Sequence, residues 1–166
     1  GGGPAGAVLA FMLARQDIAV TLLEAHHDFD RDYRGDTLHP SILEIMDELG
    51  LAECLLQLPH TKLDKLTAQT PLGPVEMAGF ARLKTKFPYI ALMPQVHFLE
   101  FVTQEAKRFP AFRLVMGARV DELIEEEGEI EGVRYHGADG QHEVRALLTV
   151  GADGRYSQLR KLGGFQ

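Results

Sequence analysis

The sequence is poor in cysteine, with Cys54 as the single example among 166 residues. One cysteine excludes an intrachain disulfide, a CxxC redox pair and a cysteine-rich zinc site, and it suits a reducing compartment. No stretch approaches the roughly 18 consecutive apolar residues of a membrane-spanning helix, and no basic region precedes an apolar run as in a signal peptide. We therefore expect no transmembrane segment and a cytoplasmic location.

Positive charge is also scarce. Lysine and arginine number 17 against 24 aspartate and glutamate, which gives a formal net charge of -7 and a pI near 5.5. Nucleic acids and anionic membranes call for a basic surface, so neither is an expected partner. Apolar residues make up 45% and charged residues 25%, as in ordinary globular proteins. These properties favour a folded protein that binds a small molecule.

Common hydrolase and metal-binding motifs are missing as well. The sequence contains neither HExxH nor GxSxG. The aspartates of "DFDRDY" are spaced like the start of a calcium loop, but Tyr33 stands where that loop needs glycine and His39 where it needs a bidentate glutamate. His26 and His27 are adjacent and so point apart. We predict no metal site and no side-chain nucleophile.

The first residues, "GGGPAG", have the spacing Gly1-x-Gly3-x-x-Gly6 of a dinucleotide-binding loop. A helix is predicted directly after it, over 4–15, because "PAGAVLAFMLAR" is apolar almost all round and rich in helix formers. The β-branched and leucine run "IAVTLLE" then predicts a buried parallel strand that ends in Glu24. Helix and strand make half of a βαβ unit and place the loop at a helix N-terminus.

In such a unit each motif residue has a physical role. Gly1 permits the tight turn, Gly3 lets a pyrophosphate approach the backbone, and Gly6 allows close packing of helix on sheet. The carboxylate of Glu24 would accept hydrogen bonds from a ribose hydroxyl and repel a 2′-phosphate, which favours FAD or NAD over NADP. Two simpler interpretations stay open: the glycines could form an ordinary flexible turn, and Glu24 could be a solvated strand end.

Two further groups of residues lie beside predicted elements. In "DYRGDTLHPS", Arg34, Gly35 and Asp36 precede a helix, where an arginine could neutralise phosphate and a glycine could admit a ligand. In "LLTVGADGRYSQLR", a predicted buried strand runs directly into Asp153, and open α/β sheets bind ligands at the carboxyl ends of their strands. An ordinary capped loop and an ordinary turn remain the alternatives.

The rest of the chain divides by its hydrophobic pattern. "HPSILEIMDELGL" predicts a helix with Gly50 as its C-cap, and its apolar face is predicted to contain Ile42, Leu43, Ile45, Met46 and Leu49. Short alternating runs over 60–90 predict strands and turns, and a helix is predicted over 94–109 with Val96, Leu99, Phe101 and Val102 as its apolar residues. Beyond it we expect a strand in "FRLVMG", a hairpin with Gly128 in its turn, and further strands that include "ALLTV".

Taken together, "GGGPAG" with Glu24, "RGDTLHPSILEIMDELGL", "MPQVHFLEFV" and "GADGRYSQLRK" stand in the order and at the spacing of one known family. The chain resembles the class A FAD-dependent aromatic hydroxylases, the p-hydroxybenzoate hydroxylase-like flavoprotein monooxygenases. The resemblance implies an α/β fold: a Rossmann-like FAD-binding domain of the glutathione reductase/p-hydroxybenzoate hydroxylase type, with part of a β-rich substrate domain. It implies that the FAD-binding domain covers 1–58 and 91–166 and that 59–90 are substrate-domain strands.

The resemblance also implies site residues. Glu24 would hold the adenosine ribose, and Arg34 would approach the pyrophosphate. Gln95 matches the family glutamine near the ribityl chain, Val120 matches the residue whose backbone faces adenine, and Asp153 lies in the Asp-Gly motif associated with both FAD and NAD(P)H. The loop that would hold the FAD pyrophosphate consists of Gly1, Gly3, Pro4, Ala5 and Gly6.

Family members have a buried strand before the glycine loop and a later Gly-Asp flavin motif, and this sequence shows neither. We therefore expect a fragment truncated at both ends and poorly stable, because its central strand would have been paired on both edges. We expect the isolated chain to bind FAD weakly or not at all and to be inactive, since a loop without preorganisation must be ordered on binding.

The reaction implied by the resemblance uses NAD(P)H as co-substrate to reduce FAD. Oxygen would then form a flavin C4a-hydroperoxide that delivers a hydroxyl to an aromatic or similarly electron-rich small molecule. The cofactor carries this chemistry, so no catalytic side chain is predicted. The alternatives are a related flavoprotein halogenase or reductase on the same scaffold, or a flavin-binding remnant without activity.

Overall fold

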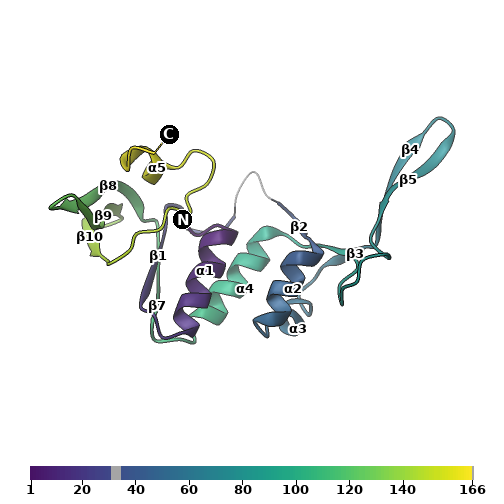
Figure 1. Cartoon of the computed structure of the whole chain (residues 1–166), viewed down its shortest axis with the longest axis horizontal. Coiled ribbons are helices and arrows are strands. Elements are labelled where there is room, and N and C mark those ends of the chain that lie inside the picture. The colour runs from purple at the N-terminus through teal and green to yellow at the C-terminus, as the bar shows by residue number, and fades with distance from the viewer. Residues whose placement is uncertain (31–34, 166) are drawn as a thin grey trace. The chain divides into compact units, whose positions relative to one another are not determined.

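The computed structural model of the chain describes residues 1–30 and 35–165. These residues fall into two compact units, the first comprising Gly1–Asp30 and Leu99–Gln166 and the second Arg31–Phe98. Each unit mixes helices and strands (Figure 1), so the predicted α/β class is confirmed.

The first unit contains helix α1, Pro4–Arg15, and two parallel strands. Strand β1, Val20–Glu24, pairs with β7, Phe112–Met116, along its whole length. Helix α1 has proline in its first turn, where a missing N–H costs nothing. Its buried face consists mainly of small residues, which let neighbours approach closely: Gly6, Ala7, Ala10, Phe11 and Ala14. The helix and strand predicted for this region are confirmed.

A three-stranded antiparallel sheet lies in the same unit, in the order β10-β9-β8. Strands β8, Arg119–Glu126, and β9, Glu129–Gly137, are joined by Glu127 and Gly128, whose φ angles of 52° and 86° are both positive. A two-residue loop with positive φ at both positions matches the twist of a hairpin, and glycine adopts it without strain. The predicted hairpin with Gly128 in its turn is confirmed. Strand β10, Gly140–Arg145, completes the sheet.

The strand predicted for "ALLTV" is wrong. The Ala146 N–H still donates to the Glu131 carbonyl at 2.9 Å, but residues 147–150 form no strand. A strand needs a neighbour to exchange backbone hydrogen bonds with. The described part of the chain pairs no strand with this segment, and its side chains remain outside any core: Leu148 is 76% exposed and Leu147 fully so.

The second unit contains short elements. They are β2 (Thr37–Leu38), α2 (Pro40–Glu48), α3 (Ala52–Leu55), β3 (Thr61–Leu63), β4 (Lys65–Thr70), β5 (Gly73–Gly79), β6 (Ile90–Leu92) and the beginning of α4 (Gln95–Ala106). One antiparallel sheet has the order β2-β6-β3, and β4 and β5 form a separate hairpin. Strands β3, β4 and β5 lie within 59–90, and the assignment of that range to a substrate domain stays a prediction.

The predicted helix over α2 is confirmed, but its apolar face is narrower than predicted. Leu43 and Met46 are buried, whereas Ile42 and Ile45 are 36% and 40% exposed. A nine-residue helix contacts its neighbours along one stripe of positions three or four apart, and the residues beside that stripe stay accessible. Gly50, with φ +75°, follows the end of the helix, as a C-terminal glycine does.

The predicted helix over α4 is confirmed, but only part of its predicted buried stripe is correct. Leu99 and Val102 are buried as predicted, and so is Phe98, which was not expected. Val96 and Phe101 are only half-buried. None of the helices within 1–30 and 35–165 is long and apolar enough to cross a membrane.

Candidate functional site

The glycine loop forms the N-terminus of α1. Gly3 is the N-cap residue, and its carbonyl accepts the Ala7 N–H at 2.9 Å. Gly3 has no side chain that could cap this helix end, and the first turn carries no acidic residue. The first-turn N–H groups and the positive end of the helix dipole are therefore left to an external anion, and phosphate binds to helix ends of this kind.

The three motif glycines differ in how much space surrounds them. A Cβ on Gly6 would lie 1.9 Å from the Gly1 carbonyl oxygen, and a Cβ on Gly1 would lie 2.5 Å from the Ala152 carbonyl oxygen. Both neighbours are backbone atoms, which cannot move without disturbing the loop. A Cβ on Gly3 would meet nothing within 4 Å. Packing thus requires Gly1 and Gly6, whereas Gly3 leaves the backbone open to a ligand.

Glu24, at the end of β1, is 5% exposed. Its Oε2 accepts the Gly2 N–H at 2.7 Å, which ties the strand end to the glycine loop. Its Oε1 accepts the His26 N–H at 2.9 Å and lies 2.7 Å from His26 Nδ1. A buried carboxylate needs such donors, because an unpaired charge away from water is costly. The interpretation of Glu24 as a solvated strand end is therefore wrong.

Asp153 organises the turn that leads into the short helix α5, Gln158–Leu162. Its Oδ1 accepts the Ser157 hydroxyl at 2.6 Å, and its Oδ2 accepts the N–H groups of Gln158 at 2.7 Å and Leu159 at 3.0 Å. Partial burial acts to raise the pKa of Asp153, but these hydrogen bonds outweigh it and hold the pKa below its usual value. The carboxylate is thus ionised at neutral pH, and these hydrogen-bond partners lie within six residues of it in the sequence.

The predicted residues of the first unit meet where β1 ends and α1 begins. A Cβ on Gly1 would lie 2.9 Å from the Asp153 Cα, so the glycine loop packs on the Asp-Gly segment. The Ala118 N–H donates to the Glu24 carbonyl at 2.8 Å, and Val120 follows two residues later in β8. The loop, Glu24, Val120 and Asp153 are therefore held near one another by backbone contacts.

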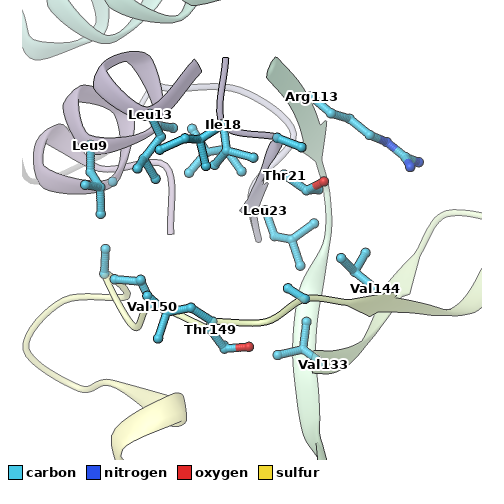
Figure 2. A pocket seen from close by; sticks show the side chains of 18 of the residues that line it. Leu9, Leu13, Ile18, Thr21, Leu23, Arg113, Val133, Val144, Thr149 and Val150 are labelled. Carbon is cyan, nitrogen blue, oxygen red and sulfur yellow. The ribbon is translucent and has the colours of Figure 1, made fainter. Parts of the chain in front are cut away.

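An apolar cavity of about 680 Å³ lies beside this loop within the first unit. Leu9 of α1, Leu23 of β1 and Val150 lie around it (Figure 2). Residues 18–23 and 144–150 line it without interruption, so one side is formed by β1 and another by the segment that failed to become a strand. This lining suits apolar groups rather than phosphate.

The remaining predicted residues lie in the second unit. The Gln95 N–H donates to Asp36 Oδ1 at 3.4 Å, and a Cβ on Gly35 would lie 3.7 Å from Gln95 Nε2. The Asp36 carbonyl accepts the Met93 N–H at 2.9 Å. Gly35, Asp36 and Gln95 thus form one small polar cluster at the start of α4. Arg34 lies outside the described residues.

The surroundings of Glu24 include residues that the sequence did not single out. Gly2 donates to the carboxylate, and a Cβ on Gly2 would lie 3.2 Å from the Phe29 ring. The side chain of His26 has Glu24 as its partner. The sequence signal that could have identified His26 is its position two residues after Glu24, the acidic residue at the end of the strand.

Among residues 1–30 and 35–165, no group of three or more His, Cys, Asp or Glu is placed to hold a metal ion.

A sequence model of one protein family, described as the FAD binding domain, matches residues 1–166. The chain belongs to this FAD-binding family. The whole chain lies within the match, so the predicted FAD-binding fold class and the resemblance to FAD-dependent monooxygenases are confirmed.

Individual relatives of this FAD-binding chain are monooxygenases and an epoxidase. It is 35% identical over 164 residues to 6-methylpretetramide 4-monooxygenase of Streptomyces rimosus, covering 99% of this chain and 39% of the relative. It is 32% identical over 166 residues to squalene epoxidase 5 of Arabidopsis thaliana, covering 97% and 32%. The structure of OxyS anhydrotetracycline hydroxylase from Streptomyces rimosus matches with a TM-score of 0.80 at 30% identity, covering 99% and 32%. The chain thus spans between about a third and two-fifths of the length of these relatives.

Proposed function

We propose that residues 1–166 are the cofactor-binding part of an FAD-dependent monooxygenase that uses NAD(P)H and O2 to hydroxylate an electron-rich small molecule. The observation that carries the proposal is the open backbone at Gly3, at an uncapped helix end tied to the buried carboxylate of Glu24. Backbone N–H donors suited to a phosphate and a carboxylate acceptor suited to a ribose hydroxyl thus belong to neighbouring residues, in a chain that matches an FAD-binding family throughout. This donor and acceptor set fits the ADP half of FAD.

The residues of this chain would bind and orient FAD. The loop formed by Gly1, Gly3, Pro4, Ala5 and Gly6 would hold the pyrophosphate, and Glu24 would accept hydrogen bonds from the adenosine ribose. Val120 would present its backbone to adenine, and Gln95 and Arg34 would serve the ribityl and pyrophosphate groups. Asp153 would belong to the same cofactor site, and its hydrogen bonds to the start of α5 would shape the segment against which Gly1 packs.

FAD, when bound, supplies the redox chemistry: it takes electrons from NAD(P)H and uses them on O2. The proposed hydroxylation consumes one NAD(P)H, one proton and one O2 for each substrate molecule and releases one water. The relatives are named for different substrates, one after 6-methylpretetramide and one after squalene. We therefore propose only the substrate class, an aromatic or similarly electron-rich small molecule. We propose the cytoplasm as the location of the protein.

The complete natural chain that carries residues 1–166 is expected to purify yellow. It should oxidise NADH or NADPH with stoichiometric O2 uptake once an accepted substrate is present, because bound FAD links the two reactions. Visible absorbance and an oxygen electrode provide the measurement. A folded, colourless chain that cannot be reconstituted with FAD would contradict the proposal.

Glu24→Ala in that chain is expected to weaken FAD binding by about 1–3 kcal/mol, the scale for hydrogen bonds to a charged acceptor. The change removes the proposed ribose acceptor and the partner of the Gly2 N–H together. Fluorescence titration of the apoprotein measures the affinity, and Glu44→Ala, at an exposed position of helix α2, serves as the control. If FAD binds both variants equally well, Glu24 has a structural role alone.

A further inference from the structure

The imidazole of His26 reaches back to the carboxylate at the end of β1. His26 Nδ1 lies 2.7 Å from Glu24 Oε1, and the backbone N–H of His26 donates to the same oxygen at 2.9 Å. When the Glu24 carboxylate is ionised it only accepts hydrogen bonds, so the imidazole makes this contact in the tautomer with the proton on Nδ1. The contact is therefore an N–H···O bond to a charged acceptor, which is the stronger class of hydrogen bond.

The backbone on which His26 stands is fixed by the connection between β7 and β8. The Gly117 N–H donates to the His26 carbonyl at 2.8 Å, and the Ala118 N–H donates to the Glu24 carbonyl at 2.8 Å. Gly117 has φ +67°, and a Cβ there would lie 2.7 Å from the His27 ring. His27 thus packs on Gly117, and His26 alone of the two has its ring on Glu24.

The carboxylate of Glu24 is restrained at both oxygens. Gly2 donates to Oε2, and His26 holds Oε1. The backbone N–H of His26 also donates to Oε1, so the imidazole adds a second contact to that oxygen. The Glu24 side chain is 7% exposed and that of His26 is 62% exposed, so this added contact comes from a side chain that contributes little to the core. Ordering a flexible side chain on binding costs affinity, and a side chain ordered beforehand avoids that cost.

We propose that His26 is a positioning residue for nucleotide binding. It holds the Glu24 carboxylate in the orientation that accepts hydrogen bonds from the vicinal hydroxyls of a ribose. This inference rests on the proposed function, in which Glu24 receives the adenosine ribose of FAD. Its ligand class is an adenine nucleotide with both ribose hydroxyls free.

The test compares two ligands that differ only in those hydroxyls, ADP and 2′,3′-dideoxy-ADP. Both are titrated calorimetrically into the complete natural chain after removal of FAD. His26→Ala should weaken ADP binding about three- to tenfold, the affinity equivalent of leaving one more side chain to be ordered on binding. Binding of the dideoxy ligand should change by less than about twofold, since it makes no use of the carboxylate.

Three further variants show whether His26 acts through Glu24. His26→Asn places an amide donor near the position of Nδ1 and should restore ADP affinity to within about twofold of the original. His27→Ala, the matched control on Gly117, should leave both affinities unchanged. In a Glu24→Ala background, His26→Ala should have no further effect, because coupled residues are not additive.

Equal losses for ADP and the dideoxy ligand would overturn the positioning role, since they would reflect general disruption. Unchanged ADP binding by His26→Ala would also overturn the positioning role. Tighter ADP binding by His26→Ala would overturn it as well, because it would mean that the imidazole occupies the place of the ribose. A wild-type chain that binds neither FAD nor ADP would overturn the proposed function together with this inference. Circular dichroism melts of each apoprotein separate these outcomes from unfolding.

Discussion

Gly6→Ala is expected to weaken FAD binding strongly and to destabilise the first unit, whereas Gly3→Ala is expected to weaken FAD binding alone. At Gly6 the new Cβ would lie 1.9 Å from the Gly1 carbonyl oxygen, so the loop must move. Overpacking of this kind costs about 1–3 kcal/mol of unfolding free energy. Because the displaced backbone is the proposed phosphate site, we expect FAD affinity to fall by about 100-fold or more, close to 3 kcal/mol.

Gly3→Ala is the matched comparison because the same methyl group meets nothing within 4 Å. The backbone angles of Gly3, φ −69° and ψ 179°, suit alanine, so the unfolding free energy should fall by less than about 1 kcal/mol. The methyl group would occupy the space through which a pyrophosphate approaches, and the loss of charge-assisted hydrogen bonds should weaken FAD about tenfold or more.

Urea unfolding followed by circular dichroism gives the stability of both variants, and flavin fluorescence titration of the complete natural chain gives their affinity. Normal FAD binding by Gly3→Ala would mean that the pyrophosphate does not use this loop. Wild-type stability in Gly6→Ala would mean that the close contact with Gly1 is relieved at little cost.

A designed six-residue extension of valine and isoleucine joined to Gly1 is expected to raise the melting temperature of the 166-residue chain by about 10 °C. The extension would enter the apolar cavity beside the glycine loop, where β1 lines one side and residues 144–150 another. Burying each branched side chain contributes about 1.5–3 kcal/mol, and ordering each residue costs about 1–2 kcal/mol. With the backbone hydrogen bonds to both neighbours added, a net gain of about 3–5 kcal/mol is expected.

Two control extensions separate strand pairing from simple lengthening. Six glycine and serine residues supply length without apolar surface, and an extension with proline at alternate positions removes backbone donors from any ladder. Neither should raise the melting temperature. Amide hydrogen exchange should show new protection at Val20–Glu24 and over 147–150 with the valine and isoleucine extension alone. Equal melting temperatures for all three extensions would show that the cavity does not accept a strand.

Much of the local structure could be predicted from the sequence. Helix α1, helix α2 and the turn at Gly128 depend on residues a few positions apart: hydrophobic period, a proline near a helix start, and a glycine where φ is positive. The motif spacing also indicated where ligand-binding residues lie, because each motif belongs to one loop and its flanking elements. The family match over 1–166 confirms the FAD-binding fold class, and the individual site residues stay predictions.

The contacts between residues of the candidate site could not be predicted from the sequence in the same way. Gly2 and Glu24 are 22 positions apart and meet through one hydrogen bond, and the role of His26 depends on which way the chain turns after β1. Asp153 stays a predicted cofactor-site residue, and the sequence did not show that its oxygens accept hydrogen bonds from Ser157 and Gln158. A carboxylate accepts whichever donors the fold brings within reach, and residue type alone does not say which these are.

By itself the sequence determined the elements whose stability is local, and it determined which residue types stand at their ends. The tertiary structure decided how wide each buried face is, leaving Ile42 and Ile45 exposed, and which partners the buried carboxylate of Glu24 has. It also decided that residues 147–150, apolar enough for a strand, do not form one. The physical reason lies in the backbone hydrogen bonds. A helical residue bonds to a residue four positions away in the same segment, whereas a strand bonds to a second strand that can lie far away in the sequence.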